Sequence, residues 1–167
     1  MNIVEKFFAN SARRGLIVDT NLWILYFVGA TGEHRVGKDD FTSDYTLEDF
    51  KLLSRILQDQ RRLITTPHIL AELSNQLKFK GDLRDEFLSL FEHQVQLLDE
   101  RHCEGKRICA SPAFRDLGIT DTGITLLADE GPSIITADLD LYSCLVRAKA
   151  SVLNFNHFRV GALYGHV

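Results

Sequence analysis

The sequence predicts an α/β protein with a three-layer α/β/α sandwich around a central parallel sheet. Three observations support this class: short aliphatic segments recur along the chain, helical patterns follow them, and polar residues stand at the junctions. Strands that alternate with helices pair in parallel, because each helix crosses the sheet before the next strand begins. With 167 residues and a hydrophobic content of 45%, the chain can bury one core, so we expect a single domain over residues 1–167.

The first elements are a helix, a strand and a second helix. Apolar residues between positions 3 and 8 have helical spacing without a cleavage pattern, which indicates a packing helix rather than a signal peptide. Leu16–Val18 is a short aliphatic strand, and the helix Asn21–Val28 is expected to end near Gly29. The segment at about 29–45 is polar and lacks periodicity, so we interpret it as an insertion in the domain.

The next unit repeats this order. Thr46 and Asp49 have the spacing of a capping box at the start of a helix. Leu63–Thr65 is a second aliphatic strand. Thr66, followed by proline, is expected to cap a helix that continues to about Phe79.

The middle of the chain is less regular. Asp82 is expected to cap another helix, and Val95–Leu98 is expected to be a strand. His102–Pro112 has no pattern that assigns it to an element. A helix over Thr122–Asp129 is the next predicted element, and a glycine and a proline follow it.

Two strands and one helix complete the expected fold. Ser133–Thr136 and Val152–Phe155 are aliphatic strands, and Leu139–Ala150 is the helix between them. No apolar run approaches the roughly 20 residues of a membrane helix, so we expect no membrane contact. Three sparse cysteines do not form a disulfide framework, which favours a reducing cytoplasmic location.

The charge balance leaves the partner of the protein open. A formal net charge of −4 argues against nucleic acid, unless carboxylates gather around divalent cations that reverse the local field. Basic pairs such as Arg13-Arg14 and Arg61-Arg62 are scattered. We interpret them as solvated surface, with contact to an RNA backbone as the alternative.

Four acidic residues occupy positions where function collects in such folds. Asp19 and Asp138 each follow a predicted strand, and the carboxyl ends of parallel strands meet at one edge of the sheet. Asp121 stands at the start of a helix, and Glu72 lies beside the apolar arc of its helix. Each aspartate has an alternative role as a helix N-cap, and Glu72 has one as a solvated helix residue.

The combination favours a metal site over four separate structural roles. Caps need one acceptor and accept Ser or Thr equally well, yet three of these positions use Asp. Carboxylates held close together repel unless cations compensate. A cluster of oxygen ligands suits Mg²⁺ or Mn²⁺, which can position water and stabilise charge that develops on a phosphate.

Four motifs, taken together, resemble the PIN-domain family over about residues 16–158. In chain order they are LIVDTN, TTPHILAEL, LGITDTGI and IITADLDL, followed by SVLNF. The resemblance implies a compact α/β/α fold and Mg²⁺- or Mn²⁺-dependent endonucleolytic cleavage of single-stranded RNA with a 5′-phosphate product.

Carried over position by position, the resemblance implies a site of seven residues. The four metal-binding and catalytic acids are Asp19, Glu72, Asp121 and Asp138, and the supporting residues are Asn21, Thr136 and Asp140. Many members of the family are toxins restrained by a small partner protein. An antitoxin-like inhibitor and a homodimer are therefore further expectations.

Two other functions compete with the ribonuclease. A phosphatase of the haloacid-dehalogenase type would use Asp19 as its nucleophile and Lys106 to neutralise the phosphate. Such enzymes place a second aspartate two residues after the first, where this chain has Asn21, which cannot donate a proton as a carboxylic acid does. In a non-catalytic binding module the acids would serve only as caps.

Overall fold

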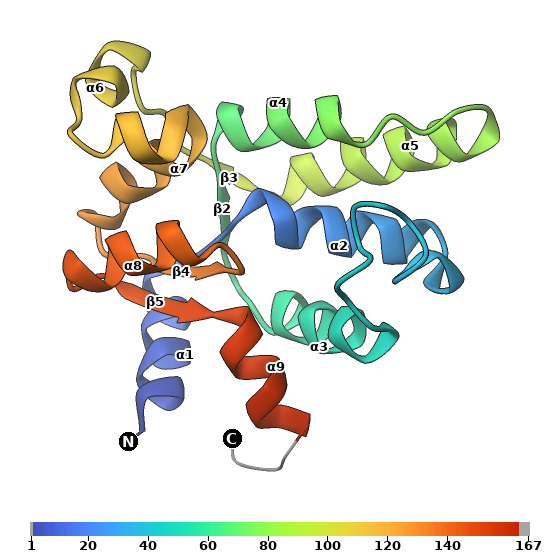
Figure 1. The fold of residues 1–167 in the computed structure, drawn as a ribbon, viewed down its shortest axis with the longest axis horizontal. Helices are drawn as coiled ribbons and strands as arrows, with labels where there is room; N and C mark the ends of the chain where they lie inside the picture. The colour runs from blue at the N-terminus through green and yellow to red at the C-terminus, as the bar shows by residue number, and fades with distance from the viewer. Residues whose placement is uncertain (1, 164–167) are drawn as a thin grey trace.

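The structure is a computed structural model that describes residues 2–163, and these residues form an α/β fold around one parallel sheet (Figure 1). The strands are β1 Leu16–Val18, β2 Leu63–Thr65, β3 Asp99–Glu100, β4 Ser133–Thr136 and β5 Ser151–Asn154. The helices are α1 Ile3–Arg14, α2 Thr20–Thr31, the 3₁₀ helix η1 Glu33–Arg35, α3 Leu47–Gln58, α4 Pro67–Gln76, α5 Asp82–Leu97, α6 Gly105–Ala110, α7 Phe114–Ala128, α8 Leu139–Arg147 and α9 Phe155–Leu163. The predicted α/β/α class is confirmed.

The order of the strands places a switch point beside β1. The sheet runs β3-β2-β1-β4-β5, with Ile17 of β1 in register with Ile64 of β2 and Ile134 of β4. The chain builds outward from β1 through β2 and β3 on one side, and later through β4 and β5 on the other. The direction of growth therefore reverses between β1 and β4, which is where open α/β sheets form a crevice at their carboxyl ends.

Helices cover both faces of the sheet. Right-handed connections put α2 to α5 on one face and α7 and α8 on the other. The contacts agree, because α2 packs on α3, α4 and α5, whereas α7 packs on α8 (Figure 1). Helix α4 also contacts α7, although the two helices cover opposite faces of the sheet. They meet where helices project past the sheet, and this contact brings Glu72 and Asp121 toward one region.

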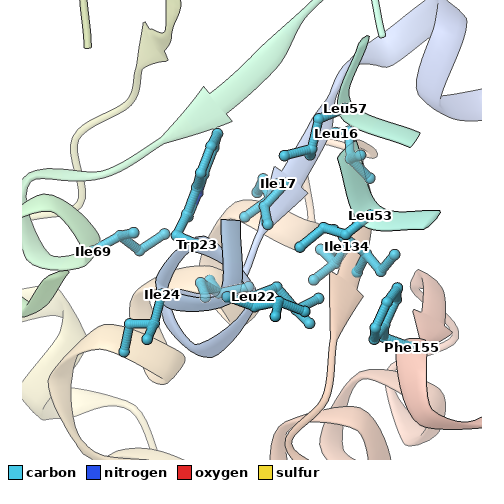
Figure 2. Packing of buried hydrophobic residues seen from close by; sticks show 14 of the residues in the cluster. Leu16, Ile17, Leu22, Trp23, Ile24, Leu53, Leu57, Ile69, Ile134 and Phe155 are labelled. Atoms are coloured by element: carbon cyan, nitrogen blue, oxygen red, sulfur yellow. The ribbon is translucent and has the colours of Figure 1, made fainter. Parts of the chain in front are cut away.

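The core is one continuous cluster centred on β1 and α2. Figure 2 shows Leu22, Trp23 and Ile24 of α2 among side chains from β1, β4, α3 and α4, with Phe155 at the start of α9. Helix α2 has no polar face, since nine of its twelve residues are buried. A helix that is buried on most sides is held in position mainly by packing. Its first turn, which follows Asp19, is therefore fixed relative to the sheet.

The second helix is longer than the sequence suggests. Gly29 was expected to end it, but α2 continues to Thr31 and Gly32 follows as the C-cap. Gly29 instead allows α3 to approach closely, because a Cβ atom there would lie 2.3 Å from the Phe50 ring. The expected insertion at about 29–45 therefore begins inside a helix, continues through η1 and turns, and buries Thr42 completely.

Three strands match their predicted bounds, and two predictions in the sheet were wrong. Val95–Leu98 was expected to be a strand, but α5 continues through Leu97, and the edge strand is only Asp99–Glu100. In this segment Val95 and Leu98 are partly buried at helical spacing, whereas Leu97 between them is 65% exposed. The last strand is shifted by one residue, to Ser151–Asn154, because Phe155 starts α9.

Several helix ends also differ from the predictions. Helix α4 ends at Gln76 rather than near Phe79, and Asp82 is the first residue of α5, not its cap. The segment His102–Pro112 contains α6. Helix α7 starts at Phe114, and Gly118, with φ of 73°, divides it into two helical parts. The second part carries Asp121 in its first turn.

Helices α8 and α9 also differ from the predictions made from the sequence. The expected helix Leu139–Ala150 stops at Arg147, where Ala148 is the C-cap. Helix α9 was not predicted. It is anchored by Arg159, whose guanidinium donates to the buried Asp49 carboxylate at 2.7 Å. This ion pair joins residues 110 positions apart, which no local pattern can indicate.

Candidate active site

Asp19 and Asp138 lie at the carboxyl ends of the two strands that flank the switch point. Asp19 follows β1 and is the N-cap of α2, where its Oδ1 accepts a 2.6 Å hydrogen bond from the Thr20 backbone N–H. Asp138 follows Ala137 after β4 and is the N-cap of α8, where its Oδ1 accepts from the Leu141 N–H at 2.7 Å. Both aspartates therefore act as caps, and each has a second carboxylate oxygen beyond the capping one.

Thr136 connects these two positions. Its hydroxyl donates to Oδ2 of Asp19 at 2.7 Å and accepts from the Asp138 backbone N–H at 2.9 Å. Thr136 is the last residue of β4 and has no exposed surface. The predicted supporting position of Thr136 thus corresponds to a direct contact with one acid and with the backbone of another.

Glu72 reaches the turn between β1 and α2 from another helix. Its Oε2 accepts from the Thr20 hydroxyl at 3.0 Å, and its Oε1 accepts from the Gln76 amide at 3.1 Å. Glu72 is only partly exposed. The structure thus brings a carboxylate of α4 to the residue next to Asp19. The prediction that Glu72 faces the rim of the core is consistent with this contact.

Burial raises the pKa of Asp19 to about 6. The carboxyl is only 3% exposed, and loss of solvation is the largest cause of the increase. Hydrogen bonds from Thr136 and Thr20 oppose the increase, and the negative charges of Asp138 and Glu72 add to it. The two hydrogen bonds therefore favour the ionised form of Asp19, whereas burial and the neighbouring negative charges disfavour it.

Asp121 shows the strongest effect of the neighbouring acids. Burial is the largest cause, and the charges of Asp19, Asp138 and Glu72 add to it, so that together they raise the pKa of Asp121 to about 8. Within residues 2–163 no side chain or backbone group donates a hydrogen bond to its carboxylate. Asp121 is thus a partly buried acid surrounded by like charge, with no protein group to compensate it.

The chemistry of the donor set fits a hard divalent cation. All four acids offer oxygen ligands, and burial together with the charges of the neighbouring acids raises the pKa values of Asp19 and Asp121, so a cation would stabilise their ionised forms. The buried hydroxyls of Thr65, at the end of β2, and of Thr122, next to Asp121, also lack hydrogen-bond partners in the described residues. Nevertheless, no three His, Cys, Asp or Glu side chains among those residues are already arranged as metal ligands.

The remaining predicted positions lie further out. Asn21 is exposed and its side chain makes no hydrogen bond within the described chain, so Thr20 and Thr136, not Asn21, orient Asp19. Asp140 is exposed in the first turn of α8. A role for Asn21 in holding water, and for Asp140 as an extra ligand, stays a prediction.

Sequence reasoning missed two residues of this site. Thr20 contacts both acids, through its backbone to Asp19 and through its hydroxyl to Glu72. Gln76 donates to Glu72 one helical turn away, and this spacing of four residues was the available signal. The contact of Thr20 had no such signal, since Glu72 is 52 positions away.

Replacing Thr136 by Val should destabilise the protein by about 1–3 kcal/mol at neutral pH. Valine keeps the volume but removes the hydroxyl, which leaves the buried Asp19 carboxylate and the Asp138 N–H without that partner. Urea denaturation at pH 7.5 measures the effect. Thr136→Ser, which keeps the hydroxyl, should lose much less, and equal stability of all three proteins would contradict the role given to this hydroxyl.

Comparison with known proteins adds no relative to this description. No protein-family model matches the chain, and no curated protein matches it at a significant level. In the part of the chain that the structure describes, no helix is both long and apolar enough to cross a membrane.

Proposed function

We propose that the protein is a metal-dependent ribonuclease that hydrolyses phosphodiester bonds of single-stranded RNA. The observation that carries this proposal is the electrostatic coupling of Asp121 to three other acids beside the switch point of the sheet. Proteins rarely keep partly buried like charges together without a function for them. In open α/β folds, ligands bind at the carboxyl ends of the parallel strands beside the switch point.

Each acid has a distinct place in the proposed site. Asp19, Glu72, Asp121 and Asp138 would hold Mg²⁺ or Mn²⁺, which when bound activates water and stabilises negative charge on the phosphate. Thr136 and Thr20 keep the Asp19 carboxylate oriented through their hydrogen bonds. Gln76 and the Thr20 hydroxyl do the same for Glu72. The Asp121 carboxylate accepts no hydrogen bond from the described part of the chain and is thereby available as a ligand.

The choice of RNA as substrate depends on the resemblance to the PIN-domain motifs. That resemblance also underlies the proposed 5′-phosphate product, antitoxin-like inhibitor and homodimer, whereas the three sparse cysteines underlie the proposed cytoplasmic location. The four motif acids occupy the end of β1, the contacting helices α4 and α7, and the start of α8. This distribution supports the proposal, because it unites motifs that are up to 119 positions apart in the sequence.

A cleavage assay with the purified protein tests the proposal. A 5′-labelled single-stranded RNA of mixed sequence should be cut in the presence of Mn²⁺ and stay intact with EDTA, and the new ends should carry a 5′-phosphate. Mn²⁺ should also raise the melting temperature of the protein, because a ligand that binds the folded state stabilises it. Absence of both effects at millimolar Mn²⁺ would refute the proposed activity.

A non-catalytic binding module is the second candidate, and one observation favours it. Asp19 and Asp138 both cap helices, which is a sufficient structural reason for an aspartate at each position. In that case Mn²⁺ would leave the melting temperature unchanged. The haloacid-dehalogenase alternative predicts a trapped aspartyl-phosphate at Asp19, but among the described residues the charges that act on Asp19 are those of Asp138 and Glu72, which would repel a phosphate.

A further inference from the structure

A cavity lies near the amino ends of β1 and β2, away from the four acids. It has a volume of about 370 Å³ and is lined by the guanidinium-bearing residues Arg13, Arg14, Arg62 and Arg101. Arg14 ends α1 just before β1, and Arg62 directly precedes β2. The cavity therefore lies beside the amino ends of β1 and β2, and Arg101 reaches it from the residue after β3, whereas Asp19 lies at the carboxyl end of β1. A strand of three residues separates these ends by about 10 Å.

Two glycines beside the cavity, Gly15 and Gly131, allow arginine side chains to lie against their backbone. A Cβ atom at Gly15 would lie 3.3 Å from Cδ of Arg62, and one at Gly131 would lie 3.3 Å from Cδ of Arg14. Both glycines have positive φ angles, of 93° and 87°, which a larger residue would adopt only with strain. The backbone therefore holds the aliphatic stems of two arginines at the cavity wall.

A shared carboxylate fixes the other side of the cavity. Asp99 accepts from Arg62 through Nε at 2.8 Å and through Nη2, and it accepts from Arg101 through Nε at 3.0 Å. Burial opposes ionisation of Asp99, but hydrogen bonds and charges from Arg101 and Arg62 outweigh it and lower its pKa. Arg101 also pairs with Glu130 at 3.0 Å. These pairs hold two guanidinium groups in place without neutralising the cavity.

The cavity keeps an excess of positive charge in an acidic protein. Four guanidinium groups face two carboxylates, those of Asp99 and Glu130, which leaves two positive charges in excess. Among the described residues, Arg13 and Arg14 make no ion pair, and both are exposed. The whole chain has a formal net charge of −4, so this concentration of arginine is not an average property of its surface.

We propose that this cavity binds the phosphate group of a small phosphate ester or of free inorganic phosphate. Guanidinium groups match phosphate oxygens through paired N–H donors, which makes arginine the preferred residue for such recognition. The unpaired Arg13 and Arg14 would donate to the ligand, while Asp99 keeps Arg62 and Arg101 oriented. The volume lies within the range of small-molecule sites. This site is separate from the four acids and does not depend on the proposed nuclease activity.

Calorimetry with the full chain in EDTA tests the proposal, because EDTA removes any metal that could bind phosphate at the acids. The probes are inorganic phosphate, adenosine 5′-monophosphate and adenosine. The two phosphate-bearing probes should bind and adenosine should not. Arg13→Gln combined with Arg14→Gln should weaken binding by roughly tenfold or more, since a hydrogen bond to a charged group contributes about 1.5–3 kcal/mol. Both residues are exposed, so folding should be retained.

A matched double variant controls for general charge. Arg55→Gln combined with Arg84→Gln removes the same charge from exposed positions on α3 and α5, outside the cavity, and should leave the affinity within about twofold. Amide chemical shifts on phosphate addition should change most around Gly15, Arg62 and Gly131. Absence of binding by both phosphate probes, equal losses in the two double variants, or shift changes elsewhere would overturn the proposal. Tighter binding of the nucleotide than of phosphate would identify the ester as the ligand, and equal binding would identify phosphate alone.

Discussion

Replacing Asp19 by Asn is expected to reduce Mn²⁺-dependent RNA cleavage by at least about 100-fold. The substitution removes one negative charge from the centre of the proposed site while it preserves size. Asparagine caps helices as well as aspartate does, so the hydrogen bond to the Thr20 N–H is retained. The amide NH2 that replaces Oδ2 cannot accept from the Thr136 hydroxyl, so urea denaturation of the variant must show that it is folded at the assay temperature before the loss of activity is assigned to the metal ligand. Initial cleavage rates on labelled single-stranded RNA measure the effect.

The control for this variant is Asp129→Asn. Asp129 is an exposed C-cap of α7 and makes no hydrogen bond to the four acids, so its loss should change the rate by less than about twofold. The Mn²⁺-induced increase in melting temperature should shrink in Asp19→Asn and persist in Asp129→Asn. Cleavage by Asp19→Asn at the rate of the parent protein would remove Asp19 from the proposed mechanism.

Replacing Asp121 by Asn is expected to stabilise the metal-free protein at pH 8 and to leave it nearly unchanged at pH 4. The pKa of Asp121 is raised to about 8 in the folded state, above its ordinary value of 3.8, so the folded state binds the proton more tightly than the unfolded chain. Its contribution to the free energy of unfolding is present below about pH 4 and is lost progressively as the pH rises toward 8. Asparagine, which has no charge, does not show this loss.

The expected difference is roughly 3 kcal/mol at pH 8, about half of the full linkage value, because Asp121 is partly exposed to solvent. Urea denaturation in EDTA at pH 4, 6 and 8 measures it. Asp116→Asn, an exposed position of the same helix α7, is the matched control and should follow the pH profile of the parent. Mn²⁺ should stabilise the parent most at pH 8, where its ligands are ionised. A pH-independent difference between Asp121→Asn and the parent would contradict the electrostatic account.

The local sequence predicted the elements whose signals are local. Leu16–Val18, Leu63–Thr65 and Ser133–Thr136 match their strands, since each is a short aliphatic run between polar residues. The capping box of Thr46 and Asp49 also formed as predicted. Errors arose where tertiary packing overrode a local signal. Gly29, for example, was interpreted as a helix stop but serves as the contact point for Phe50.

The candidate site, likewise, was predicted only in part. The motifs named Asp19, Glu72, Asp121 and Asp138, but they did not reveal that Thr20 links Glu72 to the β1–α2 turn. They also did not reveal the pKa of Asp121, because that value depends on burial and on charges from three other elements. The cluster of arginines near the amino ends of β1 and β2 was interpreted as scattered surface, since its members lie up to 88 positions apart.

The sequence by itself determined the alternation of strands and helices and the placement of acids at strand ends, because hydrophobic period and capping chemistry act within a few residues. Only the tertiary structure decided which of these acids share an environment and which arginines face one cavity. Strand order and helix crossing bring them together, and both follow from packing over the whole chain. Burial and like charge then set the pKa values of Asp19 and Asp121, and these are properties of the folded state alone.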